Sequence, residues 1–394
     1  MDKKKIWFLH ILRGMSCLII MYFHIFELFW KIYPHVRRMW QGEAMDVNVS
    51  HVLFSKFNDL LTAINLNGNL AVCMFFLLSG FVIPLTLERS KGIPFLIQRS
   101  ARIFPPYLVG LSVSCCSLLL YCLYTNQHWQ YDFKVFLINS SLVLREWTQT
   151  RSIDGINWTL EIEIKFYLLI AILAQFFDLK KARVVIGLAG FFALLYFSTF
   201  FMSGASWETI KIVIQSNVPF LAFTLVGTGF YNFYKKNFTL PKFLFFTTAV
   251  ISVAYMCTLN NSALEVSPTN YYFNACYALI VFLIFYIAND RIPYNKVLDF
   301  FGNISYPLYT VHSITSYVVM TVLYKYTQNY YICVFTAASV AITIAYIMHK
   351  TVEKMSIQMG KKWSSAYIEF INKNKKAKVT VQPVAETLEA ETRI

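Results

Sequence analysis

Charged side chains are scarce in this sequence of 394 residues. Asp, Glu, Lys and Arg make up 14% of it, whereas a soluble globular chain has about 25%. Hydrophobic residues make up 57%, and the mean hydropathy is +0.50. Such a chain cannot cover a surface that faces water, which excludes a disordered protein or a coiled coil and argues against a soluble enzyme. The composition indicates an integral membrane protein.

Disulfide and metal-ligand patterns are also missing. The eight cysteines lie in apolar stretches without C-x-x-C spacing, so we interpret them as buried apolar side chains. The histidines at helix edges and in loops show no metal-ligand spacing with a carboxylate, and the sequence therefore predicts no metal site. GxSxG, P-loop and GxGxxG fingerprints are absent.

Long apolar runs are what the sequence has instead. A membrane-spanning helix needs about 20 mostly apolar residues, and the runs are continuous rather than alternating, which argues against a β-barrel. We predict an all-α bundle of about ten transmembrane helices in residues 1–355, with a polar, partly disordered cytoplasmic tail at 356–394. The runs are 6–30, 63–87, 105–124, 158–177, 184–202, 213–231, 243–260, 271–289, 300–323 and 330–349.

The net charge of +14 follows the predicted topology. With ten spans and the N-terminus inside, Lys and Arg are about three times denser in the inner segments than in the outer ones, as cytoplasmic loops require. We therefore predict that both termini are cytoplasmic. The basic character needs no nucleic-acid partner to explain it.

The first span carries two polar residues at membrane depth, Arg13 and His24. At 100° per residue they lie on one helix face, about 16 Å apart along the axis. Arginine binds phosphate or carboxylate, and histidine moves protons near neutral pH. The alternative is that Arg13 extends to the inner headgroups and His24 is a satisfied polar residue of the core.

The run 158–177 carries three charged residues. Glu161 and Lys165 have i,i+4 spacing, and we expect them to neutralise one another. Glu163 lies on the opposite face and must find a partner on another helix or be protonated. It is our candidate catalytic carboxylate, with a structural ion pair as the alternative and Glu27 as a rival orienter of His24.

Three further segments have two readings each. Arg99 and Arg102, at i,i+3, form either a phosphate clamp or an ordinary positive inner loop. His312 either packs structurally or belongs to a site. Ser79-Gly80 is either a nucleophile or, more often, a close helix contact.

Six segments, taken in order, resemble motifs of the acyltransferase-3 family, bacterial membrane acyltransferases that include O-antigen acetylases. Thr159 stands where the family has Ser, and Met355 where it often has Pro. The matching segments are Arg13-Gly14 with His24; 75–81; Arg99 and Arg102 with Pro105-Pro106-Tyr107; 158–167; 304–312; and Val352-Glu353.

The resemblance implies an enzyme of the bacterial cell membrane that takes an acyl group, usually acetyl, from cytoplasmic acyl-CoA (acetyl-CoA). The acceptor would be a hydroxyl of an envelope polysaccharide, a lipid-linked saccharide or another carbohydrate. On this reading Arg13, Arg99 and Arg102 bind the CoA phosphates.

The resemblance also implies roles for the remaining candidates. His24 would act as general base or acyl relay, and Glu163 would orient its imidazole. Trp158, the long outer loops 31–62 and 125–157, and His312 would contribute to the acceptor site.

Two other classes stay open at this stage. A transporter or flippase for a lipid-linked glycan would use Arg13, His24 and Glu163 as a proton or anion path, but it would not require the cytoplasmic Arg-x-x-Arg and Pro-Pro cluster. A glycan polymerase would have one very large outer loop, whereas the two predicted loops are moderate and nearly equal.

Overall fold

The computed structural model describes residues 6–40, 42–45, 67–259 and 268–391. Within these ranges every regular element is a helix, which confirms the predicted all-α class. Most of the predicted outer loop 31–62, and the first residues of the predicted span 63–87, lie outside the described residues.

The helices differ widely in length, and two short segments, η1 and η3, are π-helical. In chain order they are α1(Trp7–Tyr22), η1(Phe23–Leu28), α2(Phe29–Lys31), α3(Tyr33–Trp40), α5(Gly68–Leu87), α6(Ile93–Thr125), α7(Phe133–Ser140), α8(Leu144–Trp147), α9(Asn157–Phe176), α10(Ala182–Ser198), η2(Thr199–Phe201), α11(Ala205–Tyr234), α12(Leu240–Leu259), α13(Pro268–Ile287), α14(Lys296–Val311), α15(Ile314–Thr327), α16(Tyr330–Met348), η3(His349–Glu353) and α17(Lys354–Glu391).

Eight helical segments within the described residues are long and apolar enough to cross a membrane. Two of the ten predicted spans do not meet this criterion, for identifiable reasons. Helix α9 carries Glu161, Glu163 and Lys165, and the run 300–323 is divided between α14 and α15 at His312 and Ser313. The polytopic membrane class is confirmed. The two segments that do not meet the criterion differ in cause: one carries three charges, and the other contains a helix break.

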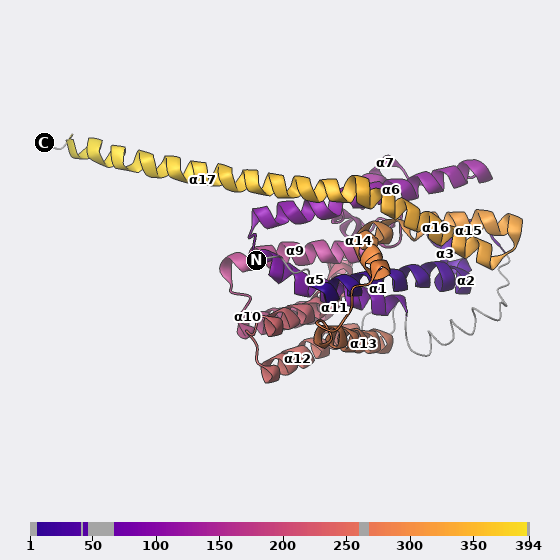
Figure 1. The fold of residues 1–394 in the computed structure, drawn as a ribbon, viewed down its shortest axis with the longest axis horizontal. Coiled ribbons are helices and arrows are strands. Elements are labelled where there is room, and N and C mark those ends of the chain that lie inside the picture. Colours follow the sequence, from indigo (N-terminus) through magenta and orange to yellow (C-terminus); the bar gives the residue numbers. More distant parts are fainter. Residues whose placement is uncertain (1–5, 41, 46–66, 260–267, 392–394) are drawn as a thin grey trace.

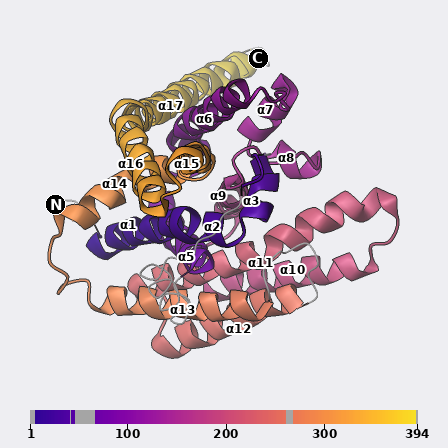
Figure 2. The same ribbon diagram turned by 90° about the vertical axis from the view of Figure 1, so that its right-hand side faces the viewer.

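The helices lie roughly side by side along the long axis of the molecule (Figure 1). Seen from the end, α1 and α5 lie centrally, with α10 to α13 on one side and α6 and α14 to α17 on the other (Figure 2). Helix α17 packs against α6 and then extends past the other helices. Helix α17 runs to Glu391, and the predicted partial disorder of the tail 356–394 stays a prediction.

Helices α5 and α11 approach each other at two facing glycines. A Cβ at Gly80 would lie 1.9 Å from the carbonyl oxygen of Thr224, and one at Gly227 would lie 2.2 Å from that of Leu77. Only glycine permits this backbone approach. The prediction of a close helix contact at Ser79-Gly80 is confirmed for Gly80.

The expected ion pair between Glu161 and Lys165 is wrong. The fully buried Glu161 carboxylate accepts hydrogen bonds from Arg145 Nε at 2.6 Å and Nη2 at 2.8 Å. Lys165 instead donates to Glu146 and, at 2.7 Å, to Asn217 Oδ1. The short helix α8 presents Arg145 and Glu146 to α9, so each charge of α9 finds a partner outside its own helix.

We predict that Gly80→Val destabilises the protein by about 3 kcal/mol, because the added side chain meets backbone rather than a movable side chain. The measurement is the unfolding temperature of the purified protein in detergent. Gly190→Val is the matched control, because a Cβ added at Gly190, which also lies in a helix, would meet no atom outside the local helix backbone within 4 Å. Equal unfolding temperatures for the two variants would contradict the close contact.

A second prediction concerns the buried pair Arg145 and Glu161. Arg145→Met leaves a buried carboxylate without its cation and should cost about 3–5 kcal/mol, whereas the double variant Arg145→Met/Glu161→Met should recover most of that loss. Thermal unfolding in detergent measures both. Lys325→Met, which removes the partner of Glu43 in a more exposed pair, should change stability by less than about 1 kcal/mol. A double variant as unstable as the single one would show that pairing is not the cause.

Candidate functional site

A cavity of about 120 Å³ lies between α1, α5, α6, α9 and α14. It has room for roughly four water molecules. Its walls are apolar on α5, with Val72, Phe75 and Ile83, while three arginines line it from other helices. The three arginines lie in the first half of α1 and of α6, toward the ends of these helices that are predicted to be cytoplasmic.

The three arginines predicted to bind phosphate meet in this cavity. Arg13 comes from α1, and Arg99 and Arg102 come from one face of α6. Arg13 Nη2 donates to Ser305 Oγ at 3.1 Å. The Arg102 guanidinium makes no hydrogen bond or ion pair with any residue that the structure describes.

Arg99 is the most buried of the three, with 7% of its surface exposed. Its guanidinium donates to Thr86 Oγ1 and lies 5.6 Å and 5.5 Å from the ring centroids of Phe95 and Tyr167. Neutral oxygens and aromatic faces therefore hold this cation in place. They leave its charge uncompensated by a carboxylate.

Glu163 supplies the one carboxylate that lines the cavity. Its Oε1 accepts hydrogen bonds from Ser79 Oγ at 2.8 Å and from the hydroxyl of Tyr167. Neither bond involves His24, so the predicted contact between Glu163 and the His24 imidazole is not present here. One carboxylate faces three guanidinium groups, and the cavity has an excess of positive charge that favours an anion.

His24 lies deeper in the bundle, within the π-helical turn η1. Such turns interrupt an α-helix and occur frequently at functional sites. His24 Nδ1 is 2.5 Å from the hydroxyl oxygen of Tyr317 on α15. The His24 ring also stands perpendicular to that of His312, with the centroids 4.9 Å apart. The structure thus brings together the two intramembrane histidines noted in the sequence.

His312 is fully buried at the break between α14 and α15. Its Nδ1 lies 2.8 Å from the carbonyl oxygen of Tyr309 and 3.2 Å from that of Leu308. Because carbonyl oxygens only accept hydrogen bonds, Nδ1 carries the hydrogen and Nε2 presents a lone pair in the neutral ring. Nε2 has no hydrogen-bond partner among the described residues.

The histidine pair and the arginine cavity are neighbouring but separate. Neither His24 nor His312 lines the cavity. Tyr309 lines it and also contacts His312, with ring centroids 5.5 Å apart. The sequence analysis did not assign roles to Tyr309 or Tyr317. Tyr309 belongs to the segment 304–312, whereas no local pattern marks Tyr317.

Trp158 does not line the cavity. Its ring packs against Phe220 of α11, with centroids 5.2 Å apart, whereas its neighbours Thr159 and Leu160 do line the cavity. Its predicted role in stacking a sugar stays a prediction.

We predict that Arg102→Met raises the unfolding temperature in the absence of anions, because it removes a cation that two like charges repel. The same change should remove most of the stabilisation that pyrophosphate gives to the unmodified protein. Thermal unfolding in detergent, with and without pyrophosphate, measures both effects. Arg89→Met is the control, because Arg89 is exposed and outside the cavity. Unchanged stabilisation by pyrophosphate in Arg102→Met would contradict an anion site here.

Comparison with known proteins places this geometry in a family. A family model described as an acyltransferase domain matches residues 6–348, a range that includes the whole cavity lining and the histidine pair. An O-acetyl transferase of Shigella phage Sf6 is 26% identical over 205 residues, which are 48% of this chain and 57% of that protein. No solved structure matches the chain. The match over most of its length confirms the resemblance seen in the motifs, and the chain belongs to the acyltransferase-3 family.

Proposed function

We propose that this protein is a membrane O-acyltransferase that moves an acetyl group from cytoplasmic acetyl-CoA to a hydroxyl of a carbohydrate. The observation that carries the proposal is the three-arginine cavity next to the pair formed by the half-buried His24 and the buried His312. The first feature suits an anionic donor, and the second suits proton transfer to and from a hydroxyl.

The donor would bind by its phosphates. Arg102 has no hydrogen-bond or ion-pair partner among the described residues and would form the strongest new contact, because a free guanidinium matches phosphate in a bidentate manner. Arg13 and Arg99 are already held by Ser305 and Thr86, so they add positive charge in fixed positions. The apolar wall of α5 would then receive the acyl thioester.

His24 would be the general base. For its Nε2 to hold a lone pair, Nδ1 must carry the hydrogen and donate it to Tyr317, which fixes the ring. His24 takes the proton of the acceptor hydroxyl as the hydroxyl oxygen attacks the thioester carbonyl. The new C–O bond forms, the C–S bond breaks, and His24 returns the proton to the CoA sulfur. His312 Nε2, which has no hydrogen-bond partner in the described part of the chain, would accept a hydrogen bond from the hydroxyl and position it.

Glu163 would act in the donor cavity rather than on His24. Its hydrogen bonds from Ser79 and Tyr167 hold its carboxylate among the arginines. There it limits their mutual repulsion before the donor binds. Ser79, which the sequence analysis considered as a nucleophile, uses its hydroxyl in this hydrogen bond to Glu163.

The proposals for the acceptor and for the cellular location rest on the comparisons and on the distribution of Lys and Arg along the sequence. The phage relative is named an O-acetyl transferase, which supports a hydroxyl acceptor, and an envelope polysaccharide or lipid-linked saccharide fits a membrane enzyme. The bias of Lys and Arg toward the inner segments supports cytoplasmic termini in a bacterial cell membrane. The donor cavity would then open toward the compartment that contains acetyl-CoA.

We predict that inverted membrane vesicles containing the protein transfer label from acetyl-CoA to saccharide. His24→Ala should lower the transfer rate at least about a hundredfold, because it removes the base, while the protein still binds CoA. The measurement is label in the carbohydrate fraction, followed by mass spectrometry of surface glycans from cells with and without the protein. His35→Ala is the control, because His35 is an exposed residue of α3.

Each outcome bears on a separate part of the proposal. Full transfer by His24→Ala would remove its catalytic role. If acetyl-CoA were never used and a lipid-linked saccharide crossed the membrane instead, the protein would be a transporter or flippase.

A further inference from the structure

The Tyr309 ring stands between the arginine cavity and the histidine pair. It lines the cavity, and its centroid is 5.8 Å from that of Phe75 and 5.5 Å from that of His312. The histidines themselves do not line the cavity. The Tyr309 ring thus contacts both the cavity and the histidine pair, on the direct line from the arginines toward His312.

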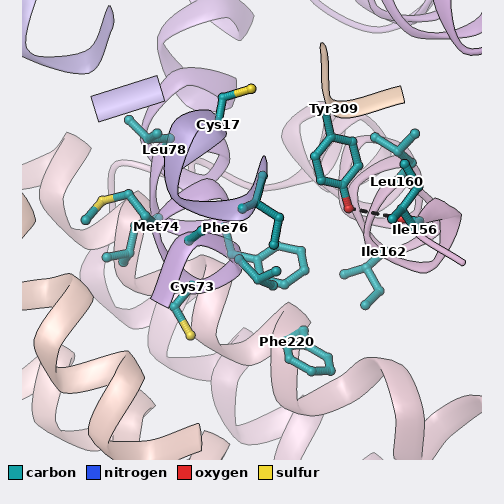
Figure 3. Close-up of a cluster of buried hydrophobic side chains, with 14 of the residues drawn as sticks. Cys17, Cys73, Met74, Phe76, Leu78, Ile156, Leu160, Ile162, Phe220 and Tyr309 are labelled. Atoms are coloured by element: carbon teal, nitrogen blue, oxygen red, sulfur yellow. Dashed lines mark hydrogen bonds between the residues drawn. The ribbon is translucent and has the colours of Figure 1, made fainter. Parts of the chain in front are cut away.

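Hydrogen bonds fix this ring in place. The Tyr309 hydroxyl donates to the carbonyl oxygen of Ile156 at 3.0 Å and lies 2.5 Å from Thr159 Oγ1. Figure 3 shows the ring beside Leu160, with its hydroxyl directed toward Ile156 at the start of α9. Tyr309 is 6% exposed. A ring that is tethered at its far end and packed along its edge cannot turn aside without breaking these contacts.

The space on the cavity side of the ring is small. The cavity measures about 120 Å³, and the α5 ring that contacts Tyr309 is that of Phe75, with centroids 5.8 Å apart. Each methylene added to the acyl group has to be accommodated between these two rings.

We propose that Tyr309, backed by Phe75, is the barrier between donor cavity and histidine pair that restricts transfer to short acyl groups. The inference rests on the proposed function, and it names the donor class of that same site: an acyl-CoA with a two-carbon acyl group in preference to four carbons. The bonds formed and broken are those of the transfer itself. Tyr309 selects the acyl group by shape and takes part in no covalent step.

The test compares acetyl-CoA with butyryl-CoA. Release of CoA thiol and label in saccharide are measured in inverted vesicles for the unmodified protein and for Tyr309→Val. The ratio of kcat/KM for butyryl-CoA to that for acetyl-CoA should rise about tenfold or more in the variant, because one methylene in a shaped pocket changes the rate by about that factor. Tyr309→Phe keeps the ring but loses the hydrogen bonds that hold it, and should raise the ratio less than Tyr309→Val does.

Tyr306 provides the matched control. It lies one turn earlier on α14, lines the same cavity, and donates its hydroxyl to the carbonyl oxygen of Ile103 at 2.8 Å, but the described ring contacts place only Tyr309 of the two against His312. Tyr306→Val therefore enlarges the cavity without opening the barrier. We expect it to leave the butyryl-to-acetyl ratio within about twofold of that of the unmodified protein.

Phe75→Val keeps the inference testable if Tyr309→Val does not fold, since it removes the other half of the barrier and should raise the ratio in the same direction. An unchanged ratio in both Tyr309→Val and Phe75→Val, or an equal rise in Tyr306→Val, would overturn the inference. Those results would leave the proposed function intact, provided that the unmodified protein uses acetyl-CoA. A protein that uses neither acyl-CoA would instead overturn the proposed function.

Discussion

Three guanidinium groups share one small cavity inside a helical bundle that contains few other charges. Charge at membrane depth is costly and is retained where it has a purpose. The surrounding helices keep these groups in place with Ser305, Thr86 and aromatic rings, which hold a cation without neutralising it. Glu163 lines the cavity and Glu353 attracts Arg13 from outside it, so these two carboxylates reduce the repulsion of the three guanidinium groups without balancing it. The cavity therefore favours an anion from outside the chain, and we propose that this anion is the donor acyl-CoA.

A second group of charges lies between α8, α9 and α11, and there each charge is compensated by an opposite one. Arg145 binds Glu161 with two hydrogen bonds, and Lys165 binds Glu146. Acid and base are equal in number there, so no net charge remains to attract a ligand. The contrast separates the two kinds of buried charge in this molecule. Charges that neutralise each other attach the short helix α8 to the bundle, while charges that do not neutralise each other form the binding cavity.

Local spacing was sufficient to predict part of this arrangement. Arg13 could be placed on one face of the first span together with His24, and Arg99 and Arg102 could be placed together on one helix face, because these relations follow from the period of a helix. Partners on other helices could not be predicted in this way. The pairing of Glu161 with Arg145 depends on a four-residue helix in a loop, and the barrier at Tyr309 depends on ring contacts between separate helices. The fold class follows from composition, whereas the division into a donor cavity and a histidine pair requires the tertiary structure.

The central proposal is that acyl-CoA binds with its phosphates at the arginines and its thioester directed toward Tyr309 and His24. The most direct measurement is an experimental structure of the protein in lipid with a non-hydrolysable acetyl-CoA analogue. We expect phosphate oxygens within hydrogen-bond distance of Arg102 and at least one of the other two arginines, with the acetyl group at the Tyr309 ring. An analogue bound elsewhere in the bundle, with the arginine cavity unchanged, would contradict this proposal.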